Sequence, residues 1–226
     1  MAIRSTAGSG ARLSPDQIVG RLVTAATRLL AEEGPGEIKA RSVADAAGVS
    51  ATAVYYHIGG MPELLEAVAD KGFRDLERAF DAVATDGDPV TALFAMALAT
   101  REVAQNNPHL YDLMFGLSSR GSYRPPGQRH AGSTGRSEAF QSVYDHLALA
   151  CKRLLESDRV ATDESPDQIA GQLWSCVHGF LSLEIGGQFS LFPDPVRQVL
   201  VPATVKIFVA LGDSPERAVQ SEAMLL

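Results

Sequence analysis

The chain of 226 residues, 24.0 kDa in mass, is long enough for one large domain or for a small domain joined to a larger one. With 46% apolar residues, 21% charged residues and a mean hydropathy of +0.01, it can bury a substantial core, which excludes a disordered chain and a coiled-coil rod. The net charge of −7 argues, at face value, against a nucleic-acid partner.

No apolar run reaches the ~20 residues that span a bilayer, and the first dozen residues lack the apolar middle of a secretion signal. We therefore expect a cytoplasmic protein with no membrane partner. Two cysteines, Cys151 and Cys176, are too few for a disulfide framework and favour buried, reduced thiols. The histidines lack metal-ligand spacing, and the usual hydrolase, metalloprotease, dinucleotide and phosphate-loop motifs are missing. We expect no metal, no cofactor and no enzymatic activity.

Helix signals follow one another after a small, polar segment, residues 1–13, which is predicted to be a disordered arm. Ser14 followed by Pro15 and Gln17 is a typical helix start, and the same arrangement recurs at Ser165. Apolar spacing and Gly, Pro and Asn punctuation predict helices over 14–33, 40–47, 51–57, 61–86, 88–105, 107–117, 137–157, 165–186, 194–211 and from 214. Because no alternating run bounded by hairpin signals indicates a strand, the predicted fold class is all-α.

Residues 118–136 interrupt this series. They contain two adjacent prolines, four glycines and no apolar run, which predicts a long mobile loop. The basic side chains of this loop would either attract an anionic effector or simply be solvated: Arg120, Arg124, Arg129 and Arg136.

The most informative segment is 39–57, where two short predicted helices are joined by three residues containing Gly48. Gly48 can adopt a positive φ in the turn, and Ser50 can cap the second helix. Apolar residues face one side, where they can form a core with the first helix: Leu22, Ala26, Leu29, Val43, Ala47, Val49 and Val54. The spacing predicts a helix-turn-helix, whose second helix presents plausible groove and phosphate contacts: Ala51, Thr52, Tyr55, Tyr56 and His57.

The residues around this turn carry a family resemblance. Residues 17–70 resemble the DNA-binding domain of TetR-family transcriptional regulators at Ala26, Leu29, Glu33-Gly34, Val43-Ala44, Ala47 to Ser50, Val54 to His57 and Glu63 to Leu65. Further along, Trp174 to Gly179 followed by Leu183-Glu184 looks like the Trp-His-Gly signature of one group of TetR-type C-terminal domains. The resemblance implies a helix-turn-helix domain over 14–60, a connecting helix over 61–86 and a ligand-binding and dimerisation domain over 87–226.

The resemblance also implies the DNA contacts. Arg41 matches a position that reaches bases or phosphates, and its forked donors suit either. The full set that we expect to contact DNA is Lys39, Arg41, Ser50, Ala51, Thr52, Tyr55, Tyr56 and His57. Three members have alternative roles, since Tyr55 could pack on the neighbouring helix, His57 could serve as a helix C-terminal residue and Lys39 could be a solvated lysine.

Three positions depart from the family pattern. Lys39 or its neighbour stands where Ser or Thr usually caps the first short helix, and Ile58 stands where Phe is frequent. Met61 replaces a lysine that commonly contacts phosphate, so we expect fewer backbone contacts and a shallow salt dependence of DNA binding.

The net charge is unevenly distributed. Residues 1–60 contain six Lys and Arg against five Asp and Glu, giving +1, whereas the remainder contains 14 against 22, giving −8. DNA responds to the local field within a Debye length of ~8 Å, so the total charge does not exclude a DNA-binding N-terminal domain.

Two expectations concern the larger domain. The helices 167–186 and 194–211 are apolar on more than one face, which predicts pairing with the same helices of a second subunit, or else an intrachain core. An apolar ligand pocket is expected between helices. Its candidate residues, each of which could equally be ordinary core, are Met96, Thr100, Tyr111, Met114, Phe115, Trp174 and His178.

Together these features predict a homodimeric repressor that binds a palindromic double-stranded DNA operator and is released by a small-molecule effector. Two other classes of protein remain open at this point. One is a helical protein-interaction module whose helix-turn-helix docks protein instead of DNA, and the other is a helical enzyme.

Overall fold

A computed structural model describes residues 13–83, 87–115 and 137–225. Its described residues form helices and no strand, which confirms the all-α class. The elements are α1 (Pro15–Glu33), a 3₁₀ turn (Pro35–Glu37), α2 (Ala40–Ala47), α3 (Ala51–His57), α4 (Met61–Asp81), α5 (Pro89–Asn106), α6 (Pro108–Phe115), α7 (Glu138–Leu155), α8 (Pro166–Ile185), a π-helical turn (Val196–Leu200), α9 (Val201–Ala210) and α10 (Pro215–Ala223).

Two predictions, the arm over residues 1–13 and the loop over 118–136 with its four arginines, lie outside the described residues except for Leu13. The helix expected to reach residue 86 ends at Asp81. The chain divides into two compact units, one up to Val68 and one from Ala69 onward, and α4 belongs to both. Each unit is described by itself.

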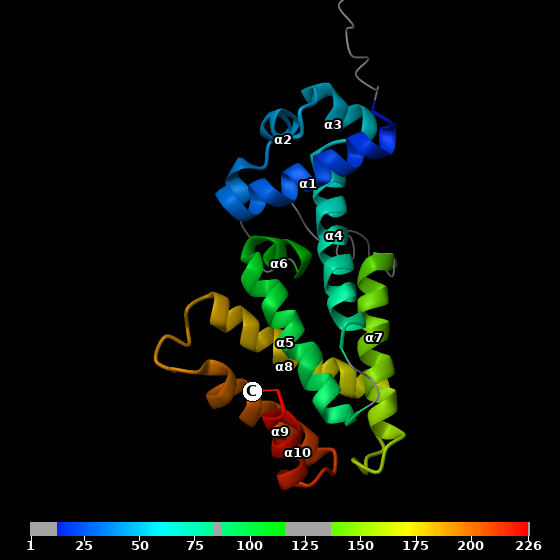
Figure 1. The fold of residues 1–226 in the computed structure, drawn as a ribbon, viewed down its shortest axis with the longest axis vertical. Coiled ribbons are helices and arrows are strands. Elements are labelled where there is room, and N and C mark those ends of the chain that lie inside the picture. The colour runs from blue at the N-terminus through cyan, green and yellow to red at the C-terminus, as the bar shows by residue number, and fades with distance from the viewer. Residues whose placement is uncertain (1–12, 84–86, 116–136, 226) are drawn as a thin grey trace, which may run out of the picture. The chain divides into compact units, whose positions relative to one another are not determined.

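In the N-terminal unit, α1 begins as its sequence predicts. The Ser14 hydroxyl accepts from the Gln17 N–H, and the Gln17 side chain accepts from the Ser14 N–H at 2.8 Å, forming a capping box. Both α2 and α3 pack on α1 (Figure 1). The residues at the centre of this packing are all buried: Leu22, Ala26, Val43, Ala44 and Val54. Four of them are small or β-branched, which allows the three helices to pack closely.

In the C-terminal unit, α5 packs on α6, α7, α8 and α10, and α7 also packs on α8 (Figure 1). Part of the core lies between α5, α6, α8 and the π-helical turn, and includes Phe94, Tyr111, Phe180 and Leu200. Among the described residues, no helix is long and apolar enough to cross a membrane.

The helix predicted over 194–211 is not one regular α-helix. Its first part is a π-helical turn, in which the Val201 N–H bonds to the Val196 carbonyl five residues back. Pro202, the second residue of α9, has no N–H and cannot donate a regular helical hydrogen bond. The wider turn accommodates that missing donor just before α9 starts, which corrects the predicted element.

A cluster of charged side chains links three interhelical segments of this unit: the one before α5, the one between α7 and α8, and the one before α10. Arg159, between α7 and α8, donates to Asp213 at 2.6 and 3.2 Å and to Ser221 at 3.1 Å, and also pairs with Asp88, the N-cap residue of α5. The Asp213 side chain is fully buried, and the Arg159 side chain is 14% exposed. Because the guanidinium reaches carboxylates at the starts of both α5 and α10, it fixes these helix ends together.

Candidate DNA-binding surface and effector cavity

The turn between α2 and α3 has the geometry that a helix-turn-helix needs. Gly48 adopts φ 68° and ψ 36°, a left-handed conformation that a larger side chain would strain. The Val49 N–H bonds to the Ala44 carbonyl at 3.0 Å, which closes the end of α2. The tight turn therefore directs α3 away from α2 while Val54 returns to the core.

The start of α2 carries two exposed cations. Lys39 is its N-cap residue and makes no side-chain cap, as the departure from the family pattern led us to expect. Its Nζ instead pairs with Glu37 at 3.3 Å, and both side chains are at least half exposed. Arg41 is also exposed. Since an exposed ion pair contributes little stability, Lys39 can exchange Glu37 for another anion at small cost.

One side of α3 is buried and the other is accessible. Ala53 and Val54 lie in the core, whereas Ser50, Ala51 and Thr52 are exposed. Ser50 is the N-cap residue, but its hydroxyl makes no capping hydrogen bond, contrary to expectation. The helix begins with a backbone bond from the Ala53 N–H to the Ser50 carbonyl at 2.9 Å.

The aromatic residues at the end of α3 differ in exposure. Tyr55 is 59% exposed and Tyr56 is 83% exposed, while His57 is half-buried with its ring edge-on to Tyr56 at 4.9 Å. Met61, the first residue of α4, is half-buried. The eight residues expected to contact DNA therefore lie on α3 and at the start of α2, and only His57 among them is not exposed.

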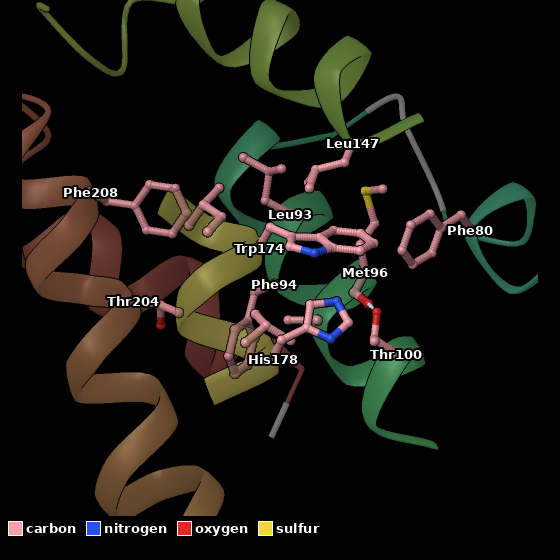
Figure 2. A pocket seen from close by; sticks show the side chains of 13 residues that line it. Phe80, Leu93, Phe94, Met96, Thr100, Leu147, Trp174, His178, Thr204 and Phe208 are labelled. Carbon is pink, nitrogen blue, oxygen red and sulfur yellow. Dashed lines mark hydrogen bonds between the residues drawn. The ribbon is translucent and has the colours of Figure 1, made fainter. Parts of the chain in front are cut away.

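The C-terminal unit contains a small, mainly apolar cavity, shown in Figure 2. Four of the seven expected ligand residues line it: Met96 and Thr100 from α5, and Trp174 and His178 from α8. The remaining lining residues are Phe80, Leu93, Phe94, Ala97, Leu147, Leu173, Val177, Thr204 and Phe208. Its volume of about 30 Å³ is close to that of one water molecule.

The other three expected ligand residues are placed differently. Phe115 lies against the His178 ring at a centroid distance of 4.3 Å, and Tyr111 bonds to His178. Met114 is buried and packs on Gly72 of α4, where an added methyl group would overlap its sulfur. Met114 is not among the residues that line the cavity. Most of the lining residues that were not expected are apolar. Their spacing in the sequence is the same for a cavity wall as for a packed core.

His178 is the main polar group of the cavity. Its Nδ1 is hydrogen-bonded to the Tyr111 hydroxyl, and its ring lies 4.2 Å from the Trp174 ring. Burial lowers the pKa of His178 to about 3, so the imidazole is neutral near pH 7. Burial also raises the pKa of Tyr111, which keeps its hydroxyl protonated. The Nε2 atom of His178 is buried and has no hydrogen-bond partner among the described residues.

A surface groove of about 420 Å³ lies beside the cavity, on α4, α5 and α7. Phe80 and Met96 line both spaces, which are therefore adjacent. The groove also carries the polar residues Asp81, His146 and Arg153. Movement of the Phe80 and Met96 side chains would therefore join the cavity to the groove.

Thr204 connects the cavity to the C-terminal helix. Its hydroxyl oxygen lies 2.5 Å from Oε1 of Glu222, a residue of α10 with no exposed surface. Burial raises the pKa of Glu222 to about 7, and the hydrogen bond to Thr204 opposes this shift only in part. Among the described residues, no group of three His, Cys, Asp or Glu side chains is arranged to hold a metal ion.

These features define a class of protein: a helix-turn-helix DNA-binding regulator with a second, all-helical unit. Residues 22–68 match the family described as "Bacterial regulatory proteins, tetR family", and residues 93–203 match "Tetracyclin repressor-like, C-terminal domain". The chain belongs to the TetR family of transcriptional regulators, and its N-terminal domain is the DNA-binding domain. The second match includes the Trp174 to Gly179 motif, and the resemblance inferred from the sequence is confirmed.

Individual relatives agree with this assignment. An HTH-type transcriptional regulator of Mycobacterium tuberculosis is 28% identical over 224 residues, which cover 87% of this chain and 92% of that protein. RolR, solved in complex with resorcinol, is 16% identical with a TM-score of 0.64, covering 94% of this chain and 96% of that chain. BioQ, solved with its double-stranded DNA operator, is 20% identical with a TM-score of 0.60, covering 88% and 99%. Both solved structures share the fold.

Proposed function

We propose that this protein is a homodimeric, cytoplasmic repressor that occupies a palindromic operator and is released from it by a small-molecule effector. It acts by binding and not by catalysis, in keeping with its family. The observation that carries the proposal is the division of α3 into a buried side and an exposed side next to the exposed Arg41. Such a helix can enter a major groove without disturbing its own core.

In this proposal the exposed residues have separate roles. Thr52 contacts base edges in the major groove through its hydroxyl and methyl groups, and Arg41 contacts a base or a phosphate. Tyr55, Tyr56 and His57 hold the phosphate backbone at the end of α3. The remaining contacts come from the start of each short helix, at Lys39, Ser50 and Ala51. The operator held by BioQ supports DNA as the partner.

The dimer forms through α8 and the segment from the π-helical turn to α9. Leu183 is 48% exposed and Ile185 is 39% exposed at the end of α8, although Phe180 and Leu181, in the preceding turn, are buried within the chain. These exposed apolar side chains favour a second subunit over a purely intrachain core. A two-fold dimer then presents two α3 helices to the two halves of a palindrome.

The effector enters the cavity beside Trp174 and His178. A cavity that binds benzene has a volume of about 150 Å³, whereas this one has about 30 Å³, so an organic effector requires the cavity to open. The resorcinol held by RolR supports an organic effector. Linkage then requires that the effector and the operator weaken each other's binding by the same factor.

The test is footprinting on the intergenic DNA upstream of the protein's own gene. We expect protection of an inverted repeat. Replacing Arg41 or Thr52 with Ala should weaken binding by about 1–3 kcal/mol, because each substitution removes a contact while leaving the core intact. The matched control is Arg28→Ala, which removes an exposed arginine on α1 that pairs with Glu32 at 3.7 Å. No protection at low salt, or equal losses for Arg28→Ala and Arg41→Ala, would overturn the proposal.

A further inference from the structure

The unpaired nitrogen of His178 indicates what kind of molecule the cavity takes. Among the described residues, the buried side-chain nitrogen and oxygen atoms without a hydrogen-bond partner are Nε2 of His178 and Oε2 of Glu222. His178 lines the cavity, whereas Glu222 does not. Because buried polar groups are nearly always hydrogen-bonded, an unpartnered nitrogen on a residue that lines the cavity is a candidate to bind a ligand atom.

The hydrogen-bond network assigns the hydrogen of this imidazole. The Tyr111 side chain is buried, and its hydroxyl hydrogen has the His178 Nδ1 as its acceptor. If Nδ1 carried the hydrogen instead, the tyrosine hydroxyl would donate to nothing in the described structure. The neutral imidazole therefore accepts at Nδ1 and carries its one hydrogen on Nε2. The Nε2–H of His178 is therefore a hydrogen-bond donor for a ligand. Its orientation is fixed because aromatic rings pack on the imidazole.

The rest of the wall excludes an ionised ligand. Among the described residues, no Asp, Glu, Lys or Arg lines the cavity. Of the two threonines, Thr100 donates to the Met96 carbonyl at 2.8 Å (Figure 2). The Thr204 hydroxyl is engaged with Glu222 and with backbone carbonyls. A charge on the ligand would thus lose its hydration without gaining a counter-ion, which is costly in an apolar site.

We propose that the effector is a neutral, mainly apolar molecule with a carbonyl or hydroxyl oxygen that accepts the Nε2–H of His178. This assignment rests on the effector role proposed above and adds the chemical class of the ligand. The ligand's apolar body packs against Trp174 and the phenylalanines of the wall, and its oxygen lies on the side of His178 and Thr100.

The protein contains its own reporter for this test. Trp174 is the only tryptophan of the chain and lines the cavity, so its fluorescence reports occupancy. Three probes of similar size separate the possibilities: acetophenone has a ring and a carbonyl, ethylbenzene lacks the acceptor, and benzoate is charged. For the full-length protein without DNA, we expect acetophenone to bind roughly fivefold more tightly than ethylbenzene, the usual effect of one net hydrogen bond. Benzoate should bind at least about tenfold more weakly than acetophenone.

Variants connect this preference to His178. His178→Phe keeps a ring but has no Nε2–H, and it should abolish the preference for acetophenone over ethylbenzene. His178→Gln retains a side-chain N–H donor and should keep part of the preference, which guards against a fold defect in the first variant. Met114→Leu is the matched control, because Met114 is buried nearby without lining the cavity. Nitrogen-15 spectra of the imidazole should show the hydrogen on Nε2 in the wild type.

Each opposite result overturns the assignment. These are equal binding of acetophenone and ethylbenzene, tighter binding of benzoate, a hydrogen on Nδ1, or no response to acetophenone at millimolar concentration. The measurements involve no operator, so they stand if the footprint fails. A protein that protects its operator but shows one of these results would retain the repressor function and lose only this ligand class.

Discussion

Both units of this protein carry exposed ion pairs, but among the described residues only the C-terminal unit also buries polar side chains. In the N-terminal unit the ion pairs Arg28–Glu32 and Lys39–Glu37 are at least half exposed, and the side chains expected to contact DNA lie at the surface. The C-terminal unit buries polar side chains: Thr100, Thr204, Asp213, Ser221 and Glu222. The first unit can bind DNA with its core unchanged, whereas the cavity of the second, at about 30 Å³, can take an organic ligand only by opening.

The largest effect that would test this difference is the loss of Arg159. Arg159→Ala removes the less exposed of the two guanidinium partners of the buried Asp213 and also removes the pairing with Asp88. We expect the free energy of unfolding to fall by about 3–5 kcal/mol, since breaking a buried ion pair by removing one partner is strongly destabilising. Urea unfolding followed by circular dichroism measures this change.

Arg217 provides the matched control on the same carboxylate. It lies 3.3 Å from Asp213, but its side chain is 48% exposed. Arg217→Ala should therefore cost about 1 kcal/mol or less. If both substitutions lowered the free energy of unfolding by the same amount, burial would not determine how much a polar side chain contributes to stability.

The next effect depends on pH and concerns Glu222. Burial raises its folded-state pKa to about 7, above the ordinary value of 4.5. The folded protein therefore holds this proton more tightly than the unfolded chain. The resulting stability is fully present below pH 4.5 and is lost as pH rises through 7, with a total change of about 3 kcal/mol.

Glu222→Gln is the substitution that isolates this dependence. Glutamine keeps the shape and a side-chain oxygen that accepts from the Thr204 hydroxyl, but it cannot ionise. Denaturant unfolding of both proteins from pH 4.5 to 8 should show that the variant gains stability relative to the wild type as pH rises. A constant difference across this range would contradict a raised pKa for Glu222.

Helix boundaries and the helix-turn-helix were predictable because local chemistry determines them. Ser14 with Gln17 forms the capping box that its spacing predicts, and Gly48 has the positive φ that the turn requires. Exposure on α3 followed from simple helical periodicity, since the apolar Val54 marks the buried side. These features depend on neighbours within a few residues.

The cavity and its polar network were less predictable because they depend on residues far apart in the chain. Tyr111 and His178 are 67 residues apart, and Arg159 and Asp88 are 71 residues apart. Lining residues such as Phe80 and Phe208 have the same spacing as ordinary core residues. The proline of α9 was visible in the sequence, but its consequence, the π-helical turn before it, depends on how that segment packs.

The smallest predicted effect concerns the number of phosphate contacts that the N-terminal unit makes. Met61, the first residue of α4, cannot neutralise a phosphate, so operator affinity should fall with salt less steeply than if a lysine stood there. Met61→Lys should steepen the slope of log affinity against log salt by about 0.9, the contribution of one phosphate contact. Met61→Gln, which adds polarity without charge, should leave the slope unchanged. Titrations of the footprinted operator between about 50 and 200 mM salt measure both slopes. An unchanged slope in Met61→Lys would mean that position 61 does not face the DNA backbone. The surface that contacts DNA would then end at α3.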